Sequence, residues 1–240
     1  TVPALAYEVD FINRIEWSAE SSHVAYSTVS NQYGTSHIGV WDVVSSNMLF
    51  LTPLETSVWD IALHPDGEVL VALTMDDEFE DIASVFDVTS GVLLSGERLT
   101  TSAESINSID WHPDGKYLAA VVRNEDDTDE IRIWEMLQDY SLELVMSFEV
   151  IGQPSGSQLE WNAAGDSLAF TYLDIERDVS AVQIWDVSID DGTATLWNTY
   201  FPTLPEGMPS RFTLSGIAWS HDGTRIAAGL TWSSTQIWER

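Results

Sequence analysis

Residues 109–135 hold the pattern that decides the fold, and they read IDWHPDGKYLAAVVRNEDDTDEIRIWE. Apolar and polar residues alternate up to Trp111, and the turn sequence Pro113-Asp114-Gly115 follows. Glycine accepts the positive φ that tight hairpin turns require, so Asp-Gly between two apolar runs predicts a β-hairpin. The apolar run Tyr117–Val122 and, after a polar loop, the segment around Trp134 add further strands. This stretch therefore predicts consecutive antiparallel strands.

The same pattern recurs along the whole chain. Two interleaved series of residues recur along the chain, and in both the separation between successive members increases. Successive members of the first series are 46, 48, 50 and 58 residues apart. The first series, at the end of each first strand, is Trp17, Leu63, Trp111, Trp161 and Trp219. The second series is Trp41-Asp42, Phe86-Asp87, Trp134-Glu135, Trp185-Asp186 and Trp238-Glu239. A fixed period near 50 residues indicates a repeat architecture.

Each repeat has the strands of one small sheet. A fourth β-like run follows each of the first four Trp-Asp segments, at Asn47–Thr52, Val92–Leu99, Ser141–Phe148 and Thr193–Tyr200. No segment has a sustained helical period. A sheet with two apolar faces must be covered on both, and radial stacking of such sheets gives a propeller. We therefore expect an all-β, five-bladed β-propeller, in which the first-strand Ile and Trp side chains wedge between blades.

The fifth repeat ends at Arg240 after its third strand, whereas a β-like stretch, Ala4–Val9, precedes the first repeat. Pairing of Ala4–Val9 with Thr235–Glu239 would complete the fifth blade, close the ring and remove an exposed sheet edge. We expect one domain over residues 1–240, with blades near 11–52, 57–100, 105–150, 156–201, and 214–240 plus 3–10. The alternative is five blades cut from a longer array, because the sequence begins with Thr1 and not with Met.

The Trp-Asp segments and Pro-Asp-Gly turns together resemble the WD-repeat β-propeller family across essentially the whole chain. The chain would be a divergent member. No repeat has the family's Gly-His dipeptide before its first strand, the period exceeds about 40–45 residues, and five blades are fewer than is typical. The resemblance implies a rigid, non-catalytic scaffold without a cofactor. Such a scaffold binds a protein or peptide through the face that carries the loops before the first strand and between the second and third strands.

Charge narrows the classes of partner. The chain has 9 basic and 39 acidic residues, a formal net charge of −30, and no cysteine. A field of that sign repels phosphate backbones and anionic lipids, which argues against nucleic-acid and membrane-surface partners. The absence of cysteine excludes disulfides and thiolate zinc sites. A secreted or salt-tolerant setting fits this composition slightly better than the cytoplasm, and the sequence does not fix the compartment.

The loops between second and third strands concentrate carboxylates. These loops emerge at one end of a propeller, so they predict an acidic face that could attract a basic peptide or weakly bind a cation. The sequence favours the simpler interpretation, a solvated surface that keeps the protein soluble. No calcium-loop motif of the Asp-x-Asp-x-Asp-Gly type is present, and no metal site is predicted. The acidic-face candidates are Asp76, Asp77, Glu78, Asp126, Asp127, Asp129, Asp174 and Glu176.

A second set of candidates consists of aromatic and basic residues near the same loops. Trp59 stands two residues before Ile61, and the sequence favours packing that compensates for Leu63 over a role as a ligand platform. Arg211 and Phe212 belong to the longest connection before a first strand, which contains three prolines. The candidate binding residues are Trp59, Arg14, Tyr33, Phe79, Arg211, Phe212 and Trp232.

An enzymatic alternative rests on three carboxylates in matching positions of the first strands: Glu16, Asp110 and Glu160. Some five-bladed propellers are glycosidases, and a pair of such groups could act as acid and base or nucleophile in a carbohydrate-binding or glycoside-hydrolysing propeller. The same position is Ala62 and Ala218 in the other repeats. This pattern favours polar residues that line a narrow channel over catalysis.

Overall fold

The computed structural model describes residues 11–29, 36–75, 78, 80–101, 103–126, 128–150, 153–174, 176–203, 214–230 and 235–240. Within these ranges the regular secondary structure is entirely β-strand. The strands are β1 (Phe11–Trp17), β2 (His23–Val29), β3 (Ser36–Asp42), β4 (Asn47–Leu54), β5 (Val58–Leu63), β6 (Val69–Met75), β7 (Asp81–Asp87), β8 (Leu93–Arg98), β9 (Ser105–Trp111), β10 (Tyr117–Arg123), β11 (Asp129–Met136), β12 (Leu142–Val150), β13 (Gln153–Trp161), β14 (Ser167–Asp174), β15 (Val179–Ser188), β16 (Thr193–Tyr200), β17 (Leu214–Trp219), β18 (Arg225–Leu230) and β19 (Thr235–Glu239).

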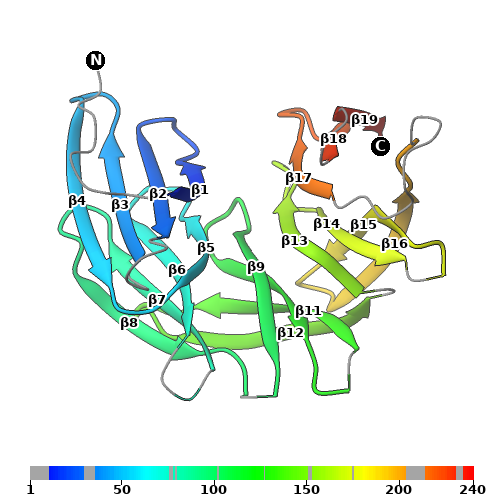
Figure 1. Cartoon of the computed structure of the whole chain (residues 1–240), viewed down its shortest axis with the longest axis horizontal. Helices are drawn as coiled ribbons and strands as arrows, with labels where there is room; N and C mark the ends of the chain where they lie inside the picture. Colours follow the sequence, from blue (N-terminus) through cyan, green and yellow to red (C-terminus); the bar gives the residue numbers. More distant parts are fainter. Residues whose placement is uncertain are drawn as a thin grey trace. The chain divides into compact units, whose positions relative to one another are not determined.

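Each sheet is built from strands that are consecutive in the sequence (Figure 1). The sheets are β1–β4, β5–β8, β9–β12, β13–β16 and β17–β19. This order confirms the all-β, five-bladed propeller, with three strands in the described part of the fifth blade. The predicted pairing of Ala4–Val9 with Thr235–Glu239, and with it residues 3–10 of the fifth blade, lies outside the described residues and stays a prediction.

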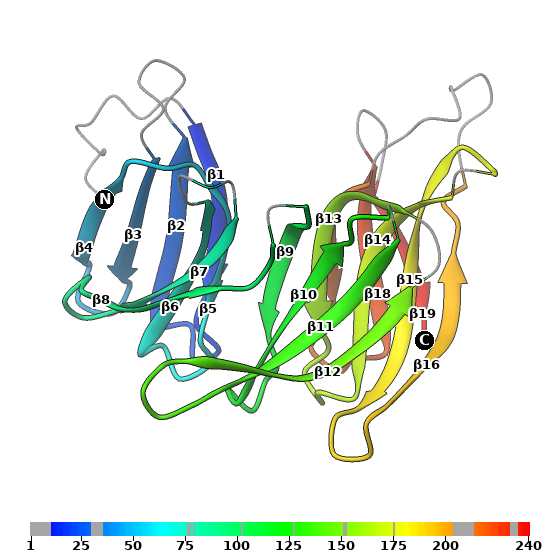
Figure 2. The same ribbon diagram turned by 90° about the horizontal axis from the view of Figure 1, so that it is seen from below.

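The chain divides into two compact units. Unit 1 comprises residues 1–105 and 136–142, and unit 2 comprises residues 106–135 and 143–240. Unit 1 therefore contains the first two sheets and the β11–β12 turn, whereas unit 2 contains the last two sheets and almost all of the third (Figure 2). The expectation of a single domain stays a prediction.

The turns between first and second strands follow the sequence prediction. Their glycines have φ values between 67° and 75°, the left-handed conformation that favours glycine, at Gly67, Gly115, Gly165 and Gly223. The first repeat has no glycine there, and Ser21 takes the same conformation with φ 56°. The turn chemistry therefore sets the register of each first hairpin.

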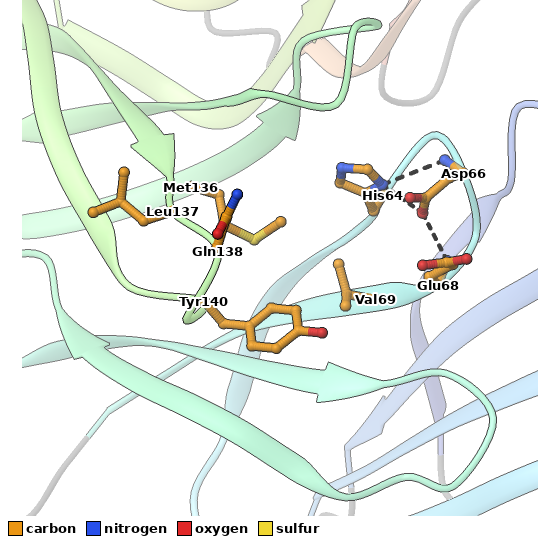
Figure 3. A pocket seen from close by; sticks show the side chains of 8 residues that line it. All are labelled: His64, Asp66, Glu68, Val69, Met136, Leu137, Gln138 and Tyr140. Carbon is orange, nitrogen blue, oxygen red and sulfur yellow. Dashed lines mark hydrogen bonds and ion pairs between the residues drawn. The ribbon is translucent and has the colours of Figure 1, made fainter.

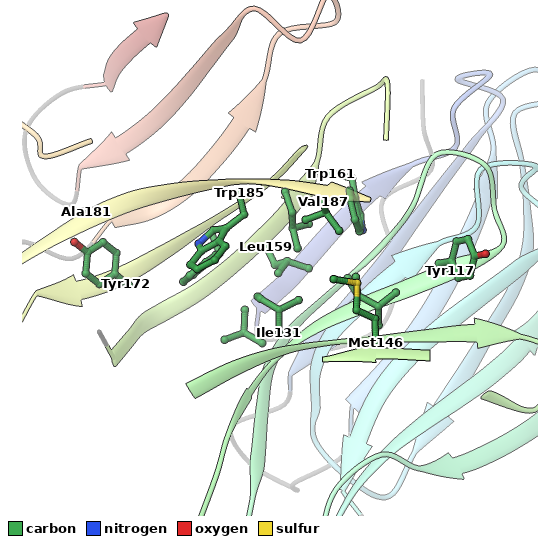
Figure 4. Close-up of a cluster of buried hydrophobic side chains, with 14 residues drawn as sticks. Tyr117, Ile131, Met146, Leu159, Trp161, Tyr172, Ala181, Trp185 and Val187 are labelled. Carbon is green, nitrogen blue, oxygen red and sulfur yellow. The ribbon is translucent and has the colours of Figure 1, made fainter. Parts of the chain in front are cut away.

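Apolar side chains join neighbouring sheets within each unit. In unit 1, Ile61 and Leu63 of the second sheet pack with Ala25, Val40 and Phe50 of the first. In unit 2, Leu159, Trp161 and Phe170 of the fourth sheet pack with Ile133 and Met146 of the third (Figure 4). Side chains of β14 and β15 also pack against β17 and β18. These clusters confirm the predicted wedging for the second, fourth and fifth repeats.

The first sheet differs at the same repeat position. Ile15 is 55% exposed and Trp17 is 56% exposed, whereas Leu159 and Trp161 of the fourth sheet are each 5% exposed. Trp17 pairs with Val24 in the β1–β2 hairpin, and the opposite face of this sheet, with Ala25 and Val40, packs on the second sheet. No described element of unit 1 covers the face that carries Ile15 and Trp17.

Candidate functional site

A β-bulge near the start of the first strand recurs between repeats. In β5, Val58 pairs with Thr74 and Asp60 pairs with Leu73, so Trp59 is the extra residue of the bulge. Asn13 in β1 and Ser215 in β17 occupy the same irregularity. A bulge redirects its side chain out of the sheet's regular alternation. Trp59 is 47% exposed. This exposure weighs against a packing role for its side chain and favours the alternative role as a ligand platform.

Arg14, the basic binding candidate on β1, contacts the neighbouring sheet of unit 1. Its Nε donates to Asp60 Oδ1 at 2.8 Å, and Asp60 is 4% exposed. Beside it, the Asn13 side-chain amide donates to the backbone oxygen of Val58 at 2.9 Å. Arg14 therefore neutralises a buried carboxylate and joins β1 to β5, a role that the sequence did not reveal.

Two of the three first-strand carboxylates accept backbone hydrogen bonds from the next sheet of unit 2. Asp110 Oδ2 accepts from the Trp161 amide at 2.7 Å, and Glu160 Oε1 accepts from the Trp219 amide at 3.3 Å. The first strand is an edge of its sheet, so these amides have no strand partner on that side. Glu16 is half-buried on β1 of unit 1. Asp110 and Glu160 thus perform a structural task that satisfies exposed strand edges.

The residue two positions earlier in the repeat extends this pattern. Ser108 Oγ accepts from the Leu159 amide at 3.2 Å, and Gln158 Oε1 accepts from the Ile217 amide at 2.9 Å. Alternate side chains of one first strand therefore cap alternate amides of the next. Ser108 and Gln158 were not among the sequence candidates, although their place two residues before Asp110 and Glu160 is a signal that points to them.

In the third sheet, the acidic-face candidates separate into two kinds. The Asp129 side chain is 0% exposed and its Oδ1 accepts from Arg123 Nε at 3.1 Å, so it contributes little to the solvent-facing charge. Asp126 is exposed, and its Oδ1 accepts from the Thr128 hydroxyl at 2.6 Å and from the Thr128 amide at 3.2 Å. These hydrogen bonds lower the pKa of Asp126 below its usual value. Glu130 pairs with Arg132.

In the fourth and second sheets, some of the acidic-face candidates pair with arginines and others are exposed. The Asp174 carboxylate accepts from the Arg177 amide at 2.9 Å and pairs with the Arg177 guanidinium, which also stacks over the Phe201 ring. The hydrogen bond from the Arg177 amide is the main reason why the pKa of Asp174 is lowered. Glu176 is exposed, and Glu78, with a side chain 68% exposed, pairs with Arg98 at 3.0 Å. Arginines therefore offset part of the acidic charge of these loops.

The remaining sequence candidates lie outside the described residues: Tyr33, Asp76, Asp77, Phe79, Asp127, Arg211, Phe212 and Trp232. Among the described residues, no group of three or more His, Cys, Asp or Glu side chains could hold a metal ion. The described part of the chain also has no helix with the length and hydrophobicity needed to span a membrane.

Consecutive meander sheets that pack face to face define a β-propeller. One stretch of this chain also matches the model of a known repeat family. The family model "WD domain, G-beta repeat" matches residues 86–135. This stretch runs from the Phe86-Asp87 segment to the Trp134-Glu135 segment, which is one full period of the chain. The resemblance to WD-repeat propellers is therefore confirmed over that period.

Several solved structures share the fold at low sequence identity. The Cps50 (Swd1) β-propeller domain of Myceliophteria thermophila is 17% identical with a TM-score of 0.70, covering 95% of this chain and 70% of its own. Hydrazine synthase of Kuenenia stuttgartiensis is 16% identical with a TM-score of 0.67, covering 93% and 56%. The WD40 domain of Toxoplasma gondii coronin is 12% identical with a TM-score of 0.66, covering 92% and 53%. No curated protein sequence matches the chain.

Proposed function

We propose that this propeller is a non-catalytic scaffold that binds a protein or peptide through the end of its sheets that carries the loops between second and third strands. The observation that carries the proposal is the exposed Trp59. Its bulge lies opposite Thr74, at the end of the second sheet where β6 leads into the loop that contains Glu78. A half-exposed tryptophan at the same end of the sheet as the exposed Glu78 suits a partner that combines apolar and basic side chains.

Charge supports a basic partner. In unit 2, Glu125 and Glu176 are exposed in the corresponding loops of the third and fourth sheets, and the whole chain carries a formal net charge of −30. Loop carboxylates steer an oppositely charged partner and raise its association rate more than they raise its affinity. WD-repeat propellers commonly act as interaction scaffolds, which agrees with this function.

Anisotropy titrations with labelled basic, neutral and acidic peptides of equal length test the proposal. We expect the basic peptide to bind best, and its binding to weaken between about 0.05 and about 0.5 M salt because the Debye length shortens. Trp59→Ala should weaken binding, whereas Trp197→Ala, which removes a tryptophan of similar exposure from the outer strand β16, should not. Binding that does not depend on peptide charge or on salt would exclude electrostatic attraction of the partner. Equal effects of the Trp59 and Trp197 variants would exclude Trp59 as a contact of the partner.

The exposed Trp59 also suits a sugar ring, so a carbohydrate-binding or glycoside-hydrolysing propeller is the second candidate. The hydrogen bonds of Asp110 and Glu160 to backbone amides weigh against hydrolysis, because they hold each carboxylate on a neighbouring strand. Assays with nitrophenyl glycosides decide between the two. Turnover that disappears in both Asp110→Asn and Glu160→Gln would replace the scaffold by the hydrolase, and the scaffold predicts no turnover in the parent protein.

A further inference from the structure

A pocket of about 320 Å³ opens in unit 1, at the end of the second sheet opposite to the loop that contains Glu78. Strand β6 runs from Val69 at this pocket to Met75 at the loop, so the two sites are separated by the length of the strand. One wall is the β5–β6 turn and the other is the β11–β12 turn (Figure 3). The lining residues are His64, Asp66, Glu68, Val69, Met136, Leu137, Gln138 and Tyr140.

Both walls are held in place by their own hydrogen bonds. In the β5–β6 turn, the His64 amide donates to Val69 O at 2.9 Å and the Gly67 amide donates to His64 O at 2.8 Å. The buried His64 ring contacts Asp66 Oδ1 through Nδ1 at 2.5 Å. In the β11–β12 turn, the Tyr140 amide donates to Leu137 O at 2.9 Å. A ligand that enters would therefore find the walls already ordered, which reduces the entropy lost on binding.

The lining combines an apolar floor with negative charge at the rim. Val69 is buried and Met136 is half-buried, and the Tyr140 ring extends from its turn toward Val69 (Figure 3). Asp66 and Glu68 are exposed on the opposite wall, and no described arginine or lysine forms an ion pair with Glu68. We propose that this pocket binds the side chain of an arginine from a partner, with the aliphatic stem on Val69 and Met136.

Arginine fits this combination better than a compact cation does. Its guanidinium is planar, pairs with carboxylates and stacks on aromatic rings, and its stem covers apolar surface. Tyr140 supplies the ring and Glu68 the carboxylate. The site does not depend on the proposed loop-face function, because its residues belong to turns at the other end of the sheet.

The test uses the full chain with ¹³C-methyl methionine, since Met136 is one of only five methionines. A Met136→Leu variant assigns its resonance. We expect N-acetyl-arginine amide to shift the Met136 methyl resonance saturably, and N-acetyl-citrulline amide, which has the same length without the charge, to do so far less. Glu68→Gln should weaken binding of the arginine probe by about threefold or more, as the loss of an exposed ion pair.

Glu149→Gln is the matched control, because it removes one exposed carboxylate of β12 that does not line the pocket. It should leave the titration unchanged, as should a Glu125→Gln and Glu176→Gln double variant of the loop face. No saturable shift, an equal response to citrulline, or equal weakening by Glu149→Gln would overturn the proposal. Peptide binding that still depends on the loop-face residues would then leave the proposed function standing.

Discussion

The carboxylate of Asp110 accepts a hydrogen bond from the backbone amide of Trp161 at 2.7 Å, across 51 residues of sequence. The two residues lie on the first strands of adjacent sheets in unit 2. Residue Asp110 therefore satisfies the open edge of the next strand, and Trp161 wedges its ring into the cluster between the two sheets. One repeat position supplies the apolar wedge and the position before it supplies the polar bond.

Removal of these carboxylates should loosen specific amides. In Asp110→Ala, we expect hydrogen exchange of the Trp161 amide to accelerate by about tenfold, which corresponds to the net worth of one hydrogen bond. Glu160→Ala should accelerate the Trp219 amide less, because that bond is longer, at 3.3 Å, and the Trp219 indole still donates to the Glu160 backbone oxygen. Unchanged exchange at Trp161 in Asp110→Ala, measured by NMR, would contradict this account.

The turn glycine of the fourth repeat should not tolerate a side chain. Gly165 has φ 74°, and a β-carbon there would overlap the His112 imidazole, which also hydrogen-bonds the Gly165 backbone oxygen at 2.9 Å. We expect Gly165→Ala to destabilise the protein by about 2–3 kcal/mol, from backbone strain plus the clash. Gly192→Ala has a similar φ of 63° with nothing nearby and isolates the strain. If urea denaturation shows that Gly165→Ala and Gly192→Ala lose the same unfolding free energy, the clash with His112 does not contribute.

The buried and exposed carboxylates of one acidic loop should behave differently. Asp129→Asn should cost about 2 kcal/mol of unfolding free energy, because it leaves the half-buried Arg123 guanidinium without its charged partner. Asp126→Asn, three residues earlier, changes an exposed side chain and should cost less than about 1 kcal/mol. Chemical denaturation of both variants checks this, and a loss at Asp126 as large as that at Asp129 would show that burial is not the cause.

Asp222 should make stability depend on pH in the acid range. Its Oδ1 accepts from the Ser220 hydroxyl at 2.6 Å and from the Thr224 amide at 3.1 Å, and these bonds lower its pKa to about 2. A pKa that is lower when folded adds stability above the unfolded value of 3.8, and this contribution is lost as pH falls toward 2. The stability difference between the parent and Asp222→Asn should therefore be constant near neutral pH and shrink below pH 4. A difference that persists unchanged to pH 2 would exclude this role.

The strands were predictable because the signals that specify them are local. Apolar residues form a run in Tyr117–Val122 and alternate with polar residues in Thr193–Tyr200, and turn residues flank both segments. The structure has strands at Tyr117–Arg123 and Thr193–Tyr200. The Asp-Gly turns carry their own backbone requirement, which made their conformation predictable as well.

The roles of the polar residues could not be predicted from one strand alone. Asp129 and Asp126 look alike in sequence, but only Asp129 lies inward, beside Arg123 on the neighbouring strand β10. The Asp110 bond depends on the register between two sheets, which is set by packing far along the chain. Trp59 is exposed because it is the extra residue of a β-bulge, which changes the direction of its side chain. A prediction from strictly alternating apolar and polar residues does not account for an extra residue in the strand.

Paired charge variants test whether the loop-bearing end attracts a basic partner. The Glu125→Gln and Glu176→Gln double variant removes two exposed loop carboxylates, and a Glu143→Gln and Glu149→Gln variant removes two from the outer strand β12. The measurement is the affinity for a short labelled peptide of alternating lysine and serine at low salt, because lysine carries the same charge without the guanidinium proposed for the pocket. The account predicts weaker binding in the loop variant and parent-like binding in the strand variant. Equal weakening in both would show that only the overall negative charge attracts the peptide and that the loop-bearing end has no special role.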